Sequence, residues 1–440
     1  MNVALAKTDT GRALGDAFAA ARERLPATGK VAEARQQALE AYELSGLPHR
    51  RMEDWKYTDL RMLIREVPPP AALPDAAALK QAEASLKAAT IEGARRLVLV
   101  DGAFAPKLSD IGTPEKGLSI RSLREAINGG DGALQAELFS LDTSNPMVAL
   151  NSAMLTDGVV IDIADGCVLS QPLHIVHVAA ATGSSMFTRS LLRLGKNASA
   201  TLVESYVAAD GAKNYQAHDS LVIALGDDSR LDHVRLVEDA ADAVNISSSV
   251  VTLGAHAHFN TFGLTSGAAV SRYQPTIVFA GEGSRVETNG VNLLRGRQHA
   301  DTTLFMDHAV PHCASREVFR AVVDDRGHSV FQGRIIVRPD AQKTDAKMMT
   351  RALLLSDDAE ADNKPELEIF ADDVTCGHGA TSGALDESLL FYMRARGLPE
   401  KEAQSLLILA FVGEAIESIA SDALRELAMS AAERWLRARS

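Results

Sequence analysis

The sequence is poor in cysteine and lacks long apolar runs. Its 440 residues include only Cys167, Cys313 and Cys376, an odd number without CxxC spacing, which favours reduced thiols in the cytoplasm over a disulfide framework. No apolar run approaches the ~20 residues that span a bilayer, and the beginning, MNVALAKTDTGRALGDAF, lacks the continuous apolar segment of a secretion signal. These features predict a cytoplasmic protein.

An excess of basic residues is also missing. Lys and Arg number 45 against 58 Asp and Glu, and the formal net charge of -13 gives no general attraction for phosphate backbones or anionic lipid. We therefore expect neither nucleic acid nor membrane as a partner. The 46% apolar content still allows a sizeable core, and this length predicts two or three structural units.

The motifs of common enzymes are missing too. The sequence contains no GxxxxGK[ST], HExxH or GxSxG. The carboxylate pairs Asp324-Asp325 and Asp372-Asp373 are adjacent, so their members would point to opposite faces of a strand. A β-helical enzyme that cleaves acidic polysaccharides stays open as an alternative, although such substrates are extracellular and no secretion signal is present.

The chain changes from helical to β-rich and back to helical patterns. Apolar residues at helical spacing, such as Leu14, Phe18 and Leu25, predict helix from about Asp9 to Arg65, and the prolines of VPPPAALP end it. The predicted parts are an N-terminal helical region (1–66), a linker and mixed α/β segment (67–144), a parallel β-helix core (145–385) and a C-terminal helical region (386–440).

Four strand-like segments in the β-rich part share one pattern. In LRLGKNASA, IALGDDSRL, VTLGAHAHF and VFAGEGSRV, a strand ends in glycine and a small residue follows three positions later. The glycines are Gly195, Gly226, Gly254 and Gly281, in steps of 31, 28 and 27 residues. Such a repeat, with glycine at a sharp corner, predicts coils stacked into a parallel β-helix, with a hairpin-linked β-sandwich as the alternative. The predicted inward-facing residues include Leu202, Val222, Val251 and Ile277.

The last part of the chain reads as helices with a strongly apolar stretch. DESLLFYMRARG ends in Gly397, and Pro399 opens the next helix, whose start from Leu406 to Val412 is apolar on almost all faces. Such a helix is normally buried against its own core or against a partner. The candidate buried anchors are Leu390, Leu406, Leu407 and Phe411.

The sharpest candidate site lies in VTCGHGATSGALDE. Cys376 and His378 are two residues apart, so on a strand a thiolate and an imidazole would project together, and both are donors that iron and iron-sulfur clusters accept. Two ligands cannot complete a cluster site, so further donors must come from elsewhere on the chain or from another protein. The structural alternative is that the glycines 377, 379 and 383 form corners where the chain leaves the last coil.

Other histidines and cysteines are weaker candidates. His256 and His258 would share one strand face and could hold a metal, but a structural pair is the commoner case. His312 and Cys313 are adjacent and would point to opposite faces, unless they belong to a turn. Cys167 is expected to be a small buried apolar residue.

Two motifs resemble a known family. MEDWKYTDLR, from Met52 to Arg61, resembles the N-terminal signature of SufD proteins, and KTDAKMMTRALLLSDDAEADNKPELEIFADDVTCGHGATSGALDESLLFYMRARGL resembles the C-terminal signature of the SufB and SufD pair. The chain is identified as a member of the SufD family of iron-sulfur cluster assembly proteins, in the SufB/SufD superfamily, over essentially its whole length. The resemblance implies a right-handed parallel β-helix flanked by N-terminal and C-terminal α-helical regions.

The resemblance also implies a function and partners. A SufD-like chain would be a non-catalytic scaffold subunit that pairs with SufB and binds the ATPase SufC through helices around Leu389 to Glu417, and the isolated chain could form a homodimer. An iron-sulfur cluster or iron would be held transiently and shared with SufB, with the SufD histidine that matches His378 implicated and Cys376 close by. A flavin is associated with the family's complex.

The choice between the two paralogues rests on details of the sequence, among them the EDWKYT signature and one missing cysteine. SufB-like sequences carry a cysteine in the segment that corresponds to MTRALLLSDD, and here Arg351 stands near it. This favours SufD, and a SufB-like cluster scaffold stays the alternative.

Overall fold

The computed structural model describes residues 16–26, 30–64, 67–112, 115–130, 132–139 and 141–439. Three parts of the predicted N-terminal helical region lie outside these ranges. They are residues 1–15, which include Leu14, residues 27–29 and residues 65 and 66.

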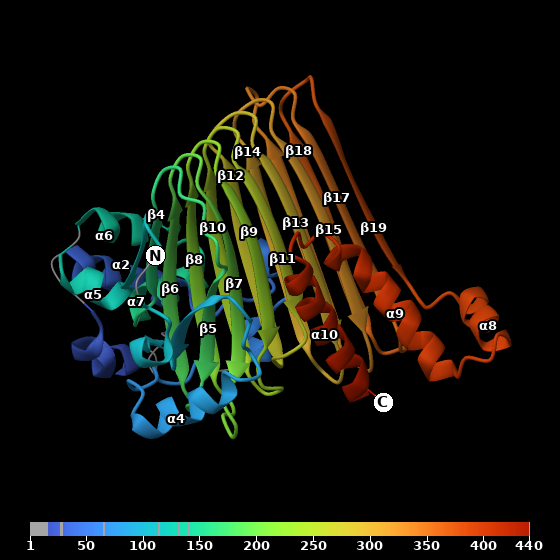
Figure 1. Cartoon of the computed structure of the whole chain (residues 1–440), viewed down its shortest axis with the longest axis horizontal. Helices are drawn as coiled ribbons and strands as arrows, with labels where there is room; N and C mark the ends of the chain where they lie inside the picture. The colour runs from blue at the N-terminus through green and yellow to red at the C-terminus, as the bar shows by residue number, and fades with distance from the viewer. Residues whose placement is uncertain are drawn as a thin grey trace, which may run out of the picture.

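Two sheets of mostly parallel strands form the centre of the molecule (Figure 1). The nine-stranded sheet has the order β18 (Glu360–Ile369), β16 (His328–Val337), β14 (His299–His308), β12 (Val270–Phe279), β10 (Val244–Leu253), β8 (Gln216–Leu225), β6 (Ser185–Leu194), β4 (Val159–Ile163) and β3 (Leu118–Ser122). The ten-stranded sheet has the order β19 (Thr375–Gly383), β17 (Asp345–Leu354), β15 (Ala314–Val323), β13 (Arg285–Leu294), β11 (His258–Thr265), β9 (Arg230–Glu238), β7 (Ser199–Ala208), β5 (Leu173–Ala179), β1 (Arg95–Val100) and β2 (Ala103–Phe104). Because the chain alternates between the sheets from β4 to β19, it winds as a parallel β-solenoid of about eight turns, and the predicted parallel β-helix is confirmed.

The repeat glycines stack on one another at one edge of the solenoid. A Cβ on Gly226 would lie 2.8 Å from the carbonyl carbon of Gly195, and one on Gly254 would lie 2.9 Å from that of Gly226. Any larger residue would therefore collide with the backbone of the preceding turn. The sequence repeat marks the corner where successive turns touch.

The interior between the sheets is apolar along this edge. Leu202, Val251 and Ile277 belong to this core, as predicted. Val222 is also buried but packs against N-terminal helices on the outer side of the nine-stranded sheet, so its predicted inward position is wrong. The second half of β8 is apolar on both faces, and a period of two cannot then select the inner face.

N-terminal helices cover the outer face of the nine-stranded sheet at its first turns (Figure 1). The helical elements before the solenoid are η1 (Arg22–Arg24), α2 (Lys30–Ser45), η2 (Glu53–Trp55), α3 (Leu60–Leu63), α4 (Ala76–Ser85), η3 (Pro106–Leu108), α5 (Leu123–Asn128), α6 (Gly132–Leu138) and α7 (Pro146–Met154). Arg35 of α2 is buried and donates hydrogen bonds to the carbonyl oxygens of Ala153 (2.9 Å) and Leu155 (2.7 Å) at the end of α7. These carbonyls have no partner within their own helix, so Arg35 ties the two helices together.

The EDWKYT motif crosses the outer face of the nine-stranded sheet. Residues 53–58 contact four successive solenoid strands through side chains. The pairs are Trp55 with Arg272 on β12, Thr58 with Asp301 on β14, Asp54 with Arg334 on β16 and Glu53 with Lys364 on β18. A segment far from these strands in sequence therefore reaches the last turn of the solenoid.

Three helices follow the solenoid, namely α8 (Glu387–Ala395), α9 (Glu400–Ile416) and α10 (Asp422–Arg439). α9 and α10 pack on the outer face of the ten-stranded sheet, whereas α8 projects away from it (Figure 1). None of the helices in the described ranges has the length and hydropathy needed to cross a bilayer.

Candidate functional site

The C-terminal end of the solenoid is open. β18 pairs only with β16, and β19 only with β17, so each sheet ends in a strand whose outer edge has no partner among the described residues. No residue of these two strands is buried, and Ile369 at the end of β18 and Phe370 directly after it are 42% and 60% exposed. An exposed strand edge is a template for pairing with another chain.

Cys376 and His378 lie on β19 at this open end. The register pairs Cys376 with Ala346 and His378 with Met348, and both partners belong to the interior core. Side chains directly opposite in neighbouring strands share a face, so the thiol and the imidazole both face the mouth of the interior. Cys376 is half-buried and His378 is exposed. The strand places the pair on one face, as the spacing predicts, and its ligand role stays a prediction.

The thiol of Cys376 is neutral in this setting. Burial raises its pKa, and the nearby carboxyl groups of Asp345 and Glu317 act in the same direction, against a smaller lowering by the amide of Ala346. A metal ion would have to displace the proton to obtain the thiolate ligand.

No third metal-binding side chain completes the pair in the described part of the chain. Two groups of three convergent His, Asp or Glu side chains occur there, and neither includes Cys376 or His378. The two donors thus form an incomplete site at a surface that lacks a partner, and a cluster that takes four ligands would need donors from a second chain.

A buried carboxyl group lies inward from this pair. The register aligns His378, Met348 and Glu317 along the inner face of the ten-stranded sheet. Glu317 is 0% exposed, and neither of its oxygens has a hydrogen-bond partner among the described residues. Burial raises the pKa of Glu317 to about 8, so the group is mostly protonated at neutral pH.

The weaker sequence candidates do not form ligand pairs. His256 lies in the turn before β11 with a φ of 55°, and only His258 belongs to the strand, so their predicted shared strand face is wrong. The turn is forced by the same corner that carries the repeat glycine. His312 also lies in a turn, with a φ of 62°, while Cys313 is buried in the interior core. Cys167 is half-buried and packs against that core.

The predicted helical anchors are only partly right. Phe411 packs against the cluster under α9, but Leu390 and Leu407 are only half-buried and Leu406 is 45% exposed. The buried face of α9 consists instead of Ile408, Val412, Ala415 and Ile416. α9 is apolar nearly all round, so the sequence could not show which side meets the sheet.

α8 carries an apolar surface that stays exposed in the described part of the chain. It has no buried residue, and Leu389, Phe391 and Tyr392 are 51%, 74% and 55% exposed. The prediction named Leu390 on this helix and missed these three. Leu389 and Tyr392 are three residues apart, a helical spacing that could have indicated the shared face.

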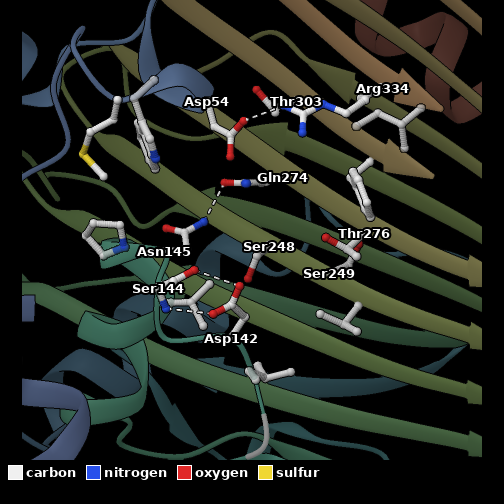
Figure 2. A pocket seen from close by; sticks show the side chains of 18 of the residues that line it. Asp54, Asp142, Ser144, Asn145, Ser248, Ser249, Gln274, Thr276, Thr303 and Arg334 are labelled. Carbon is white, nitrogen blue, oxygen red and sulfur yellow. Dashed lines mark hydrogen bonds and ion pairs between the residues drawn. The ribbon is translucent and has the colours of Figure 1, made fainter. Parts of the chain in front are cut away.

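A cavity of about 600 Å³ lies between the EDWKYT motif, residues 141–148 and the outer face of the nine-stranded sheet. Figure 2 shows Asn145 facing Gln274 of β12, with 2.9 Å between the amide nitrogen and oxygen, and Asp54 paired with Arg334 at 3.1 Å. Its polar side chains are thus largely bonded to one another. No predicted ligand residue lines it.

Arg351 does not approach the Cys376 and His378 pair. Its side chain is exposed on the outer face of β17, and its guanidinium lies 3.9 Å from the carboxylate of Glu414 on α9. The position that distinguishes this chain from SufB-like sequences therefore faces the C-terminal helices.

Comparisons with known proteins cover nearly the whole chain. Residues 177–411 match the family model "SUF system FeS cluster assembly, SufBD core domain", and residues 13–175 match "SufBD protein N-terminal region". The iron-sulfur cluster assembly protein SufD of Escherichia coli is 31% identical over 395 residues, which are 89% of this chain and 90% of that protein. An iron-sulfur cluster assembly SufBD family protein of Synechocystis sp. is 31% identical over 404 residues, with 88% and 86% covered. SufD of Bacillus subtilis is 25% identical over 302 residues, 66% of each chain.

Proposed function

The chain belongs to the SufBD family of iron-sulfur cluster assembly proteins, and we propose that it acts there as a SufD-type scaffold subunit that pairs with SufB and binds the ATPase SufC. The observation that carries this proposal is the open end of the solenoid, where two free strand edges flank an incomplete pair of ligands. Relatives named SufD favour this assignment over the SufB-like and the polysaccharide-cleaving alternatives.

Pairing with SufB would cover the open end. The exposed edges of β18 and β19 can continue both sheets into a second solenoid, because the hydrogen-bonding groups of an edge strand are unused. In the isolated chain, the same edges would pair two copies into a homodimer. ATP hydrolysis would belong to SufC, and this subunit would have no catalytic role of its own.

The shared site would hold iron or a nascent cluster as cargo. His378 would supply one donor and Cys376, less accessible, a second, while the thiolates of SufB would complete the ligand set. We assign no residue of this chain to the flavin that the resemblance implies for the complex. Because the metal-bound ligands are thiolate and neutral imidazole, protons compete with the metal for both, and loading should weaken as the pH falls.

The test is His378→Ala in the assembled complex with SufB and SufC. We expect anaerobic reconstitution to yield about tenfold less bound iron and sulfide, with unchanged subunit stoichiometry. His256→Ala is the matched control, because His256 is also exposed but lies in a corner turn. Full cluster reconstitution by the His378 variant would show that His378 is not a ligand.

We propose α8 as the main contact for SufC. Interface energy concentrates in a few large apolar residues, and Phe391 is the most exposed of them on this helix. Deleting everything after Gly397 would also strip α9 and α10 from the ten-stranded sheet, so a point change is cleaner. Phe391→Asp should lower co-purification of SufC at least about tenfold, whereas Leu44→Asp, at an 84% exposed position on α2, should not. Unchanged SufC binding by the first variant would move the docking site elsewhere.

We also propose that the protein is located in the cytoplasm, because its three cysteines are unpaired. For dissecting the subunit, we propose the division into residues 1–66, 67–144, 145–385 and 386–440. The solenoid sheets begin within the second part, because β1 pairs in parallel with β5.

A further inference from the structure

A cluster of metal-binding side chain types lies inside the first half of the solenoid, far from the open end. His177 comes from β5, Glu204 and Tyr206 from β7, Asp219 from β8 and His233 from β9 (Figure 1 shows these strands). On each strand they continue the alternation of residues that line the interior core, so all five point between the two sheets.

The donor atoms converge on one point. One oxygen or nitrogen from each of His177, Glu204 and Asp219 lies within 4.8 Å of the others. The phenolic oxygen of Tyr206 lies between the carboxylates, 2.7 Å from Asp219 Oδ2 and 3.4 Å from Glu204 Oε1. Three atoms at the corners of a triangle with 4.8 Å sides lie about 2.8 Å from its centre. Typical metal-ligand distances of about 2.1 Å would thus require each donor to move by about 0.7 Å at most.

One of these donors is buried without a partner. The Nε2 atom of His177 has no hydrogen-bond partner among the described residues and is inaccessible to solvent, and the His177 side chain is only 12% exposed. It lies 4.0 Å from Asp219 Oδ2, too far for a hydrogen bond. The ring stacks on Tyr206 with 4.4 Å between centroids, which holds Nε2 toward the carboxylates.

The two carboxylates lack an ion pair with arginine or lysine. Glu204 and Asp219 are 2% and 3% exposed, and among the described residues only histidines lie within 4.0 Å of their oxygens as potential cations. The guanidinium of Arg235 lies over the rings of Tyr206 and Tyr273 and donates to Asn245 instead. The charges of the buried Arg235 and Arg189 act on Glu204 and Asp219 from beyond 4.0 Å, so direct contact with a compensating cation is left to an ion inside the cluster.

Neighbouring groups orient the carboxylates. His233 donates from Nε2 to Glu204 Oε2 at 2.9 Å, and its Nδ1 lies 2.9 Å from the hydroxyl of Thr261. The hydroxyl of Thr188 donates to the other oxygen of Asp219. Metal ligands typically have such outer partners, which leave one lone pair of each ligand directed at the ion.

We infer that His177, Glu204 and Asp219 bind one divalent first-row transition ion inside the solenoid, with Tyr206 as a fourth donor. Imidazole with carboxylates suits Fe²⁺, Mn²⁺ or Zn²⁺, while the imidazole disfavours Mg²⁺ and Ca²⁺. Unlike the cargo site at the open end, this site is complete within one chain and largely buried. The ion would therefore be structural and would enter as the chain folds.

The experiment uses the full chain carrying Cys376→Ser and His378→Ala, so that its outcome does not depend on the open-end proposal. The protein is purified from cells grown with added iron, manganese and zinc, and its metal content is measured by mass spectrometry. We expect about one ion per chain, and refolding with Co²⁺ as a probe should produce visible ligand-field bands. A folded chain without bound metal would mean that only water bridges His177 to the carboxylates, and would overturn the inference.

A conservative variant separates binding from folding. His177→Phe preserves the stack on Tyr206 but removes the nitrogen, and we expect metal content to fall below about a tenth of an ion per chain. His174→Ala is the matched control on the same strand, because His174 is even more buried, at 1% exposed, but bonds to Ser205. Full metal content in the Phe variant would overturn the inference. If that variant does not fold, a thermal transition of the parent chain that rises with Co²⁺ supports the site, and one that stays unchanged refutes it.

Discussion

The two ends of the solenoid are built from the same parallel ladders, but their side chains meet different surroundings. In β6, nine of ten residues are buried because helices cover the outer face of the sheet, while in β18 none is buried. The first turns therefore complete their contacts within the chain. Among the described residues, the last turn leaves two strand edges unpaired and the helix α8 without a buried residue, which is the distribution expected for a subunit that folds alone and is completed by another protein.

The comparison predicts the largest loss of stability where the covering segment is anchored. Trp55 is 2% exposed, and the guanidinium of Arg272 lies 3.8 Å from the centre of its ring. Trp55→Ala should lower the free energy of unfolding by about 3–5 kcal/mol, measured by urea denaturation. Phe391→Ala, on the uncovered helix α8, should change it by less than about 0.5 kcal/mol. Equal effects would show that α8 is not free in the isolated chain.

The pH dependence of the unfolding free energy should show whether the interior stays closed to water as far as Glu317, near the open end. The pKa of Glu317 is about 8 in the folded chain against an ordinary 4.5. Between these values the folded chain holds a proton that the unfolded chain has lost, so stability should fall as the pH rises from about 5 to 8. The fall should be about 3–4 kcal/mol.

Glu317→Gln should remove this pH dependence, because the amide stays neutral in both states. Unfolding in urea at pH 5 and pH 8 measures the difference. Glu402→Gln, an exposed position on α9, is the matched control and should leave the slope unchanged. A wild-type chain whose stability does not change over this range would mean that water reaches Glu317.

Glycine-to-alanine substitutions at the two ends should differ in their effect on the unfolding free energy. Gly226→Ala places a Cβ 2.8 Å from the backbone of the preceding turn and should cost about 1–3 kcal/mol of unfolding free energy. Gly377→Ala on β19 meets no atom within 4 Å and should be nearly neutral. Thermal denaturation of both variants tests whether contact between turns, rather than glycine content, limits stability.

The smallest effect is expected at the proposed cargo ligand. His378 is exposed, so His378→Ala should change the unfolding free energy of the isolated chain by less than about 0.5 kcal/mol. His233→Ala, which removes a 1% exposed ring bonded to Glu204, should cost several times more. A large loss at position 378 would assign a structural role to this histidine.

The sequence by itself determined the position of the corners, and the repeat together with the family resemblance predicted the solenoid. Gly226 and Gly254 recur because the backbone of one turn touches the next, a local constraint that is visible as a repeat. The spacing of Cys376 and His378 likewise determined that they share a face of one strand.

Only the tertiary structure decided which surfaces are covered. Val222 and Val251 lie in similar apolar strands, yet helices distant in sequence bury one on the outside while the other lines the core. The cluster of His177, Glu204 and Asp219 is spread over 43 positions on three strands, without a motif spacing. Such residues meet only when the coils stack. Stacking places residues of neighbouring turns side by side, whatever the number of residues that separates them in the sequence.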